Sequence, residues 1–165
     1  MAMNAFSQAV VAFVSQNLGA GKFERINKVV ITAQLCVCGV GLILGNGVYL
    51  LGEPLLHLYS DSDVVIAAGL KRLSIIAVPY ALCGMMDSMV GALRGLGYSV
   101  MPMIVSLLGA CAFRMAWIFV FFQMEQFHTI DTVYFAYPIS WTLTLSVHII
   151  CFLVVRRQMK KKWGA

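Results

Sequence analysis

The chain has 165 residues, of which 61% are hydrophobic and only 12% are charged, and its mean hydropathy is +0.85. A soluble domain is typically about 25% charged, because its exterior has to be covered with polar groups. The composition therefore argues against a soluble fold and indicates that lipid is the solvent for most of the chain.

Charged residues fall into short clusters, and the runs between them are long enough to cross a hydrocarbon core of about 30 Å, which takes roughly 20 helical residues. Five runs are predicted to span the membrane as helices, at residues 1–18, 29–52, 73–93, 97–124 and 132–155. Apolar stretches such as 119–122 break the strict alternation of a barrel strand. We therefore expect an all-α integral membrane protein of about five transmembrane helices. No basic residue precedes the first run, so a cleavable signal peptide is not expected.

The connectors between these runs differ in their content of lysine and arginine. The first connector, the third connector and the C-terminal tail hold nine basic residues: Lys22, Arg25, Lys28, Arg94, Arg156, Arg157, Lys160, Lys161 and Lys162. The opposite side holds two, Lys71 and Arg72, which are expected to pair with acids of their own loop. Because basic residues are retained in the cytoplasm, we predict a plasma-membrane protein with its N-terminus outside and its C-terminus inside. The net charge of +5 then reflects this topology and contact with anionic membrane lipid, and no nucleic-acid partner is expected.

Glycines and prolines predict where these helices pack and bend. Small residues let helices in lipid approach closely, and the pairs Gly41–Gly45 and Gly91–Gly95 have the spacing typical of such contacts. Further close approaches are expected at Gly39, Gly47, Gly84 and Gly109. Kinks are expected in the last three runs at Pro79, Pro102 and Pro138, although the last two lie in or near first turns, where proline is tolerated.

Two charges are embedded in the predicted spans. Asp87 lies roughly 9 Å from the inner boundary marked by Arg94, whereas Arg114 lies roughly 24 Å from that face. A direct ion pair between the two is therefore not expected, and Arg114 is expected to reach outward or to bond polar groups outside this chain. Embedded carboxylates commonly bind a proton or a cation, which makes Asp87 a candidate coupling site. A structural hydrogen bond to a neighbouring helix is the alternative.

The other reactive residue types form no recognisable site. Five cysteines lie inside apolar runs and are expected to be buried thiols: Cys36, Cys38, Cys83, Cys111 and Cys151. Neither His148, in the last run, nor the loop residues His57 and His128 has a second ligand at helical spacing. We predict no catalytic residues, no metal site and no enzymatic activity.

Two motifs carry a family resemblance. Residues 15–22 read Ser-Gln-Asn-Leu-Gly-Ala-Gly-Lys, and residues 91–99 read Gly-Ala-Leu-Arg-Gly-Leu-Gly-Tyr-Ser with Pro102 after them. They resemble the segments of multidrug and toxic compound extrusion (MATE) transporters that close the second helix of a half and turn between its fourth and fifth helices. The motif residues that this resemblance identifies are Gln16, Gly19, Gly21, Arg94, Gly95 and Pro102.

The resemblance covers essentially the whole chain and implies helices eight to twelve of a twelve-helix, two-lobed transporter that works by alternating access to a central cavity. The chain would thus be part of the C-terminal lobe, without the first lobe and the first helix of the second. Some family members carry an acid about one turn before Asp87, where this chain has Cys83.

From the resemblance we expect export of small cationic or amphipathic molecules by antiport with H⁺ or Na⁺. Asp87 would be the coupling residue, the first and third spans would line a cavity, and no cofactor beyond the coupling ion is expected. A polypeptide of these 165 residues alone is expected to be inactive. Two alternatives stay open: a non-transporting membrane protein, either truncated or an assembly subunit, and a relative of the polysaccharide and lipid-precursor flippases.

Overall fold

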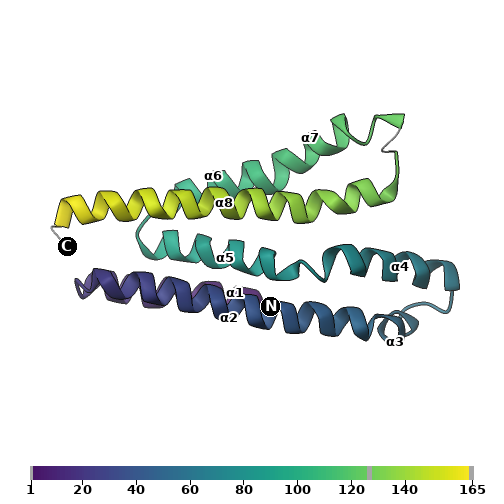
Figure 1. The fold of residues 1–165 in the computed structure, drawn as a ribbon, viewed down its shortest axis with the longest axis horizontal. Helices are drawn as coiled ribbons and strands as arrows, with labels where there is room; N and C mark the ends of the chain where they lie inside the picture. Colours follow the sequence, from purple (N-terminus) through teal and green to yellow (C-terminus); the bar gives the residue numbers. More distant parts are fainter. Residues whose placement is uncertain (1, 126–127, 164–165) are drawn as a thin grey trace.

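The computed structural model describes residues 2–125 and 128–163, so residue 1 of the first expected span lies outside the described part. Every regular element of the described residues is a helix, which confirms the predicted all-α class. The elements are α1 (Ala2–Gly19), α2 (Phe23–Leu50), α3 (Gly52–His57), α4 (Asp63–Ile76), α5 (Tyr80–Gly95), α6 (Val100–Ser106), the π-helical η1 (Leu107–Ala112), α7 (Phe113–Val120) and α8 (Ile130–Trp163). They form an elongated bundle with its long helices side by side (Figure 1).

Three helices of the described residues are long and apolar enough to cross a membrane: Phe23–Leu50, Val100–Val120 and Ile130–Lys161. The pair α4 and α5, which is bent by 49° at its break, is a fourth candidate. α1 is not among them, and its sequence is interrupted by polar residues such as Asn4, Gln8 and Gln16. The count of five spans therefore stays a prediction.

The third expected span, residues 73–93, is divided between α4 and α5 by a break at residues 77–79. Pro79 has no N–H to donate to the preceding turn, and a proline ring clashes with the carbonyl four residues earlier, so the helical hydrogen bonds stop there. The kink predicted at Pro79 is thus present. Pro102, in contrast, lies in the first turn of α6, and Pro138 lies inside an unbroken α8.

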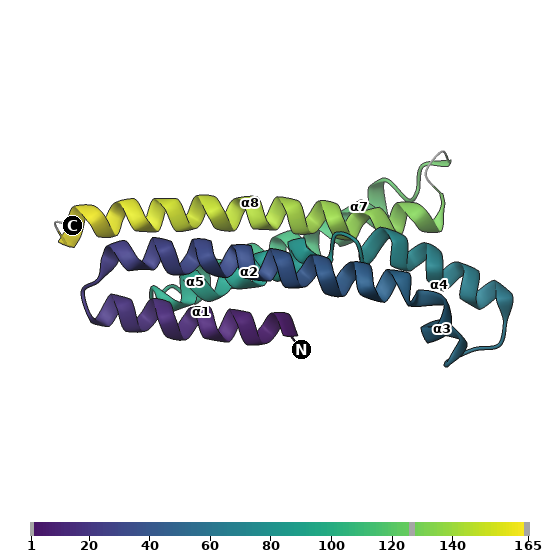
Figure 2. The same cartoon turned by 60° about the horizontal axis from the view of Figure 1, so that its bottom comes forward.

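α5 lies at the centre of the bundle and packs against α1, α2 and α8 (Figure 2). Within it, only Arg94 is exposed. A methyl group added to Gly91 would stand 2.6 Å from the carbonyl oxygen of Ser7 in α1, and one added to Gly95 would stand 2.7 Å from Cβ of Val14. These distances leave no room for a side chain, so the close approach predicted at this glycine pair is confirmed.

α2 packs against α5 through the second predicted glycine pair, Gly41 and Gly45. A methyl group on Gly41 would stand 2.7 Å from Cα of Ala81, and one on Gly45 would overlap the carbonyl oxygen of Ala77 at the α4–α5 break. Gly84 and Gly109 are also closely packed. The predicted contacts at Gly39 and Gly47 were wrong, because these residues point away from α5 and have no packing partner within 4 Å.

Much of the outer surface of the bundle is apolar. Ile43, Leu35 and Phe119 are 73%, 69% and 67% exposed, which suits contact with acyl chains better than contact with water. Cys36 and Cys111 belong to this exposed surface, so the prediction that all five thiols are buried was wrong. The runs that contain these cysteines are apolar on every side, and the pattern therefore does not distinguish a core-facing side from a lipid-facing one.

The two ends of the bundle differ in charge. The α1–α2 turn, the α5–α6 turn and the C-terminal end of α8 lie at one end, and these are the segments to which the nine basic residues belong (Figures 1 and 2). At this end Arg156 Nε donates to Asn27 Oδ1 at 2.8 Å and ties α8 to α2. At the opposite end Lys71 Nζ pairs with Asp131 Oδ2 at 2.7 Å. The predicted pairing of Lys71 within its own loop was therefore wrong, because the fold places the start of α8 beside α4.

Candidate functional site

Asp87 lies on the central helix α5, and its side chain is half-buried. Its backbone carbonyl accepts a hydrogen bond from Ser7 Oγ of α1 at 2.9 Å. Its carboxylate makes no hydrogen bond or ion pair with any residue that the structure describes. An ionised carboxylate inside a membrane helix is costly unless a proton, a cation or water meets it. The geometry leaves the carboxylate of Asp87 available to all three.

The side of α1 that points out of the bundle carries uncharged polar residues among exposed alanines and Phe13. Asn4, Gln8, Ser15 and Gln16 are exposed, whereas Val14 on the other side of the helix is fully buried against α5. Residues three and four apart share one side of a helix, so Asn4 and Gln8 are neighbours on this side, and Ser15 lies on the same side two turns further along, beyond Val11 and Ala12. Unpaired amides are poorly accommodated by acyl chains, and this side therefore fits water or a polar partner better than lipid.

Arg114 lies on α7 and turns toward α8. Its Nε donates to Ser140 Oγ at 2.9 Å, and its Cζ lies 4.2 Å from the ring centroid of Tyr137 and 5.9 Å from that of Trp141. The expectation that Arg114 reaches outward or bonds outside this chain was wrong, because α8 returns alongside α7 and supplies both the hydroxyl and the aromatic rings. In lipid such contacts satisfy a guanidinium that would otherwise be expensive to bury.

Arg114 begins a polar seam, by which we mean Arg114 and Ser106 on one helix with Ser140, Thr144 and His148 on α8. The three α8 residues recur every fourth position and are buried to 1% exposure or less. His148 Nε2 lies 3.3 Å from the carbonyl oxygen of Pro102 and 3.5 Å from Ser106 Oγ. Its other ring nitrogen, Nδ1, is buried without a well-formed hydrogen bond to the described residues.

The helix that faces the polar seam changes its hydrogen-bond pattern. Between α6 and α7 the chain is π-helical, and Gly109 within this segment abuts the side chain of Thr144 so closely that an added methyl group would overlap it. Short π segments inside α-helices are rare and frequently mark functional sites. Here the π segment places a glycine against α8, so the two backbones approach at the middle of the seam.

Sequence reasoning identified Arg114 and missed its partners. The available signal was the four-residue spacing of Ser140, Thr144 and His148 within a run that has no charge. Polar side chains that repeat on one side of a membrane helix indicate a face that contacts another helix. That spacing predicts the face, but it does not predict which helix covers it.

The two motif segments form the same kind of turn. Gly21 and Gly97 have φ of +68° and +90°, and in each case the glycine N–H donates to the carbonyl three residues back. The following residue, Lys22 or Tyr98, donates to the carbonyl five residues back. This pattern is the Schellman motif, which ends a helix in a left-handed residue and favours glycine there. Of the remaining motif residues, Gln16, Gly19 and Arg94 are exposed, and Gly95 and Pro102 are buried.

An all-helical chain with an apolar exterior, an embedded acid and two matched helix-ending turns is a membrane protein that passes through the bilayer several times. The family model MatE matches residues 1–120, a range that includes both motifs, Asp87 and Arg114, while α8 lies beyond it. The chain therefore belongs to the MatE family of multidrug and toxic compound extrusion transporters, as the motifs predicted, and members of this family are transporters rather than enzymes. No curated protein and no solved structure matches the chain.

Proposed function

We propose that this chain is part of a plasma-membrane antiporter that exports small cationic or amphipathic molecules in exchange for H⁺ or Na⁺. The observation that carries the proposal is the embedded carboxylate of Asp87, which makes no hydrogen bond or ion pair with the described residues. The gathering of basic segments at one end of the bundle supports an orientation with the C-terminus in the cytoplasm.

In this proposal Asp87 exchanges one positive charge for another. A carboxylate that is neutralised either by a proton or sodium ion or by a cationic substrate couples their movements, because one site does not hold both at once. The exposed polar residues of α1 line the water-accessible path. α5 contributes only half-buried positions such as Cys83 and Asp87, because most of that helix is enclosed by its neighbours.

The test is the substitution Asp87→Asn in a full-length version of the transporter, expressed in cells that lack their own drug exporters. The amide keeps the shape of the carboxyl group but carries no charge, so coupled efflux of a cationic dye should be abolished. Asp63→Asn, at the exposed start of α4, is the matched control and should leave efflux unchanged. Unaltered transport by Asp87→Asn removes Asp87 from the mechanism.

The rival proposal is a membrane protein that does not transport by itself, either truncated or an assembly subunit. The five apolar runs are fewer than the twelve helices that the family resemblance implies. Dye efflux from vesicles that carry only these 165 residues separates the two proposals, and we expect none. A flippase of lipid-linked precursors is less favoured, because Ser140 and Tyr137 already engage the guanidinium of Arg114.

A further inference from the structure

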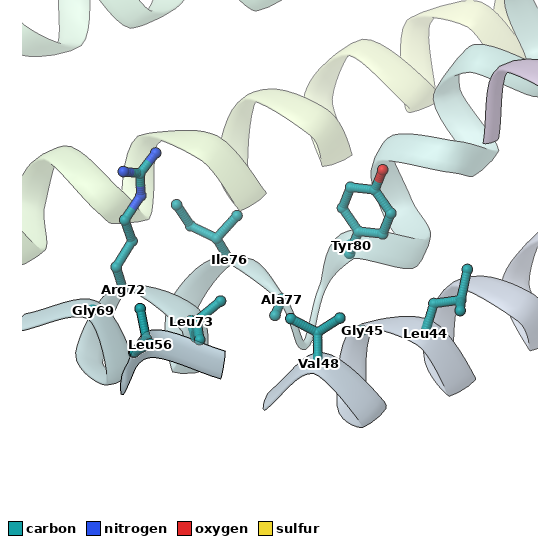
Figure 3. Close-up of a pocket in the computed structure, with 10 residues that line it drawn as sticks. All are labelled: Leu44, Gly45, Val48, Leu56, Gly69, Arg72, Leu73, Ile76, Ala77 and Tyr80. Atoms are coloured by element: carbon teal, nitrogen blue, oxygen red, sulfur yellow. The ribbon is translucent and has the colours of Figure 1, made fainter. Parts of the chain in front are cut away.

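A half-open cavity of about 660 Å³ lies between α2, α3 and the bent pair α4–α5 (Figure 3). Its walls are largely apolar and include Leu44, Val48, Leu56, Leu73 and Ile76. The break at residues 77–79 produces this space, because α2 contacts the break through Gly45 and cannot follow two helix segments that diverge by 49°. The volume is within the range of about 300–1,000 Å³ that is usual for ligand pockets. Neither Asp87 nor Arg114 lines it.

Two polar side chains line the cavity, Arg72 and Tyr80, and in Figure 3 both point to the same side of the α4–α5 pair. Arg72 Cζ lies 5.9 Å from the ring centroid of Tyr134, and no carboxylate of the described residues pairs with it. The adjacent Lys71, in contrast, is neutralised by Asp131. The cavity therefore has one uncompensated positive charge at its rim.

The charge and the apolar walls lie at different depths. Arg72 is beside Tyr134, four residues from the start of α8 and hence roughly 6 Å into that helix. Tyr80 lies at the start of α5, beyond the break at residues 77–79, and is therefore closer to the middle of the bundle. A cation near one end of the bundle, next to an apolar slot that runs toward the middle, is complementary to the charged headgroup and the acyl chain of a lipid in one leaflet.

We propose that this cavity binds an acyl chain of an anionic phospholipid whose phosphate lies against Arg72. A guanidinium matches the oxygens of a phosphate with paired hydrogen bonds. The aromatic ring of Tyr134 lies beside the guanidinium of Arg72. The lipid belongs to the leaflet at the α3–α4 end of the bundle, which is the outer leaflet in the proposed orientation. It is a bound component and not a transported one, so this site is independent of Asp87 and of antiport.

The experiment uses the full chain in vesicles of phosphatidylcholine with a minor fraction of phosphatidylglycerol. Either lipid is supplied with a photoreactive diazirine at the end of one acyl chain, and the labelled peptides are identified by mass spectrometry. We expect the phosphatidylglycerol probe to label the cavity walls around Val48 and Tyr80 about fivefold more than the phosphatidylcholine probe. This ratio is the effect expected from the attraction between one interfacial arginine and the negative charge of the lipid. Equal labelling by the two probes overturns the proposal.

Three variants make the test specific. Arg72→Gln should reduce labelling by the anionic probe to that of the neutral one, and Arg72→Lys should restore part of it. Lys71→Gln is the matched control, since it removes the same charge one residue away but outside the cavity, and should change labelling less than twofold. Equal losses from Arg72→Gln and Lys71→Gln would mean diffuse attraction and overturn the proposal. Equally strong labelling by a diazirine fatty acid would overturn the assignment to a phospholipid.

Discussion

The two sides of the bundle are held together by different contacts. α1, α2 and α5 meet backbone to backbone at glycines, and only one residue of α5 is exposed. In the helix from α6 to α7 only Pro102 is buried. This helix is attached to α8 by the polar seam. The hydrophobic effect does not drive helix association in lipid, so close packing and interhelical hydrogen bonds are the two means available. In this chain close packing joins α1, α2 and α5, and interhelical hydrogen bonds join α6 and α7 to α8.

The difference has a consequence for where the two embedded charges are placed. Backbone contact at glycines holds α5, and therefore Asp87, in one position against α1 and α2. Interhelical hydrogen bonds in membranes contribute on average about 0.6 kcal/mol each, so the seam around Arg114 is easier to open. We expect α6 and α7 to be the more mobile part, and the following substitutions test that contrast.

Gly91→Leu should have the largest effect, because its side chain would collide with the backbone of α1 at Ser7 and that backbone cannot rotate away. We expect a loss of about 3 kcal/mol in the free energy of unfolding, at the upper end of overpacking effects. The measurement is the fraction of monodisperse protein that survives heating in detergent. Gly39→Leu, which meets no neighbour within 4 Å, should have little effect, and equal losses would contradict the glycine packing.

Gly97→Ala and Gly21→Ala should each cost about 1–2 kcal/mol, the strain of a side chain in the left-handed region. Neither position has a neighbour within 4 Å, so the effect is conformational and not steric packing. Gly47→Ala, inside α2, should instead stabilise the protein by about 0.5–1 kcal/mol. The same heating assay checks all three, and a stabilising Gly97→Ala would rule out the assigned turn.

Ser140→Ala should cost about 0.6 kcal/mol, the average for an interhelical hydrogen bond in a membrane, because it removes the acceptor of Arg114. Ser146→Ala on the same helix removes a hydroxyl that bonds only its own helix at Thr142 and should change stability less. Amide hydrogen exchange of α7 should increase in Ser140→Ala alone. A loss as large as that of Gly91→Leu would contradict the contrast between the two sides.

Lys71→Gln should have the smallest effect, below about 0.5 kcal/mol, because its partner contact with Asp131 is open to solvent, with side chains 61% and 33% exposed. Added salt should weaken the wild-type contact and reduce the difference between wild type and variant further. A salt-independent loss larger than that of Ser140→Ala would show that α4 and α8 depend on this pair for their position.

Much of the fold was predictable from local sequence. Glycine spacing predicted that Gly41–Gly45 and Gly91–Gly95 lie at close helix contacts, though not which helices meet there, and Pro79 predicted the kink, because each effect depends on a backbone property of the residue itself. The partners of Arg114 and Lys71 were not predictable. Ser140 and Asp131 lie 26 and 60 positions away from them, and nothing in the intervening sequence fixes which helices become neighbours.

The sequence by itself determined that the protein is helical, that it lies in lipid, that it belongs to the MatE family and that its basic segments share one end. Those properties follow from composition, from charge-free runs and from motifs that are read along the chain. Tertiary structure alone decided which side of each helix is covered, how the polar seam is assembled and where the break opens a cavity. Core and lipid are equally apolar, so a membrane helix carries little amphipathic signal from which its inner face could be read.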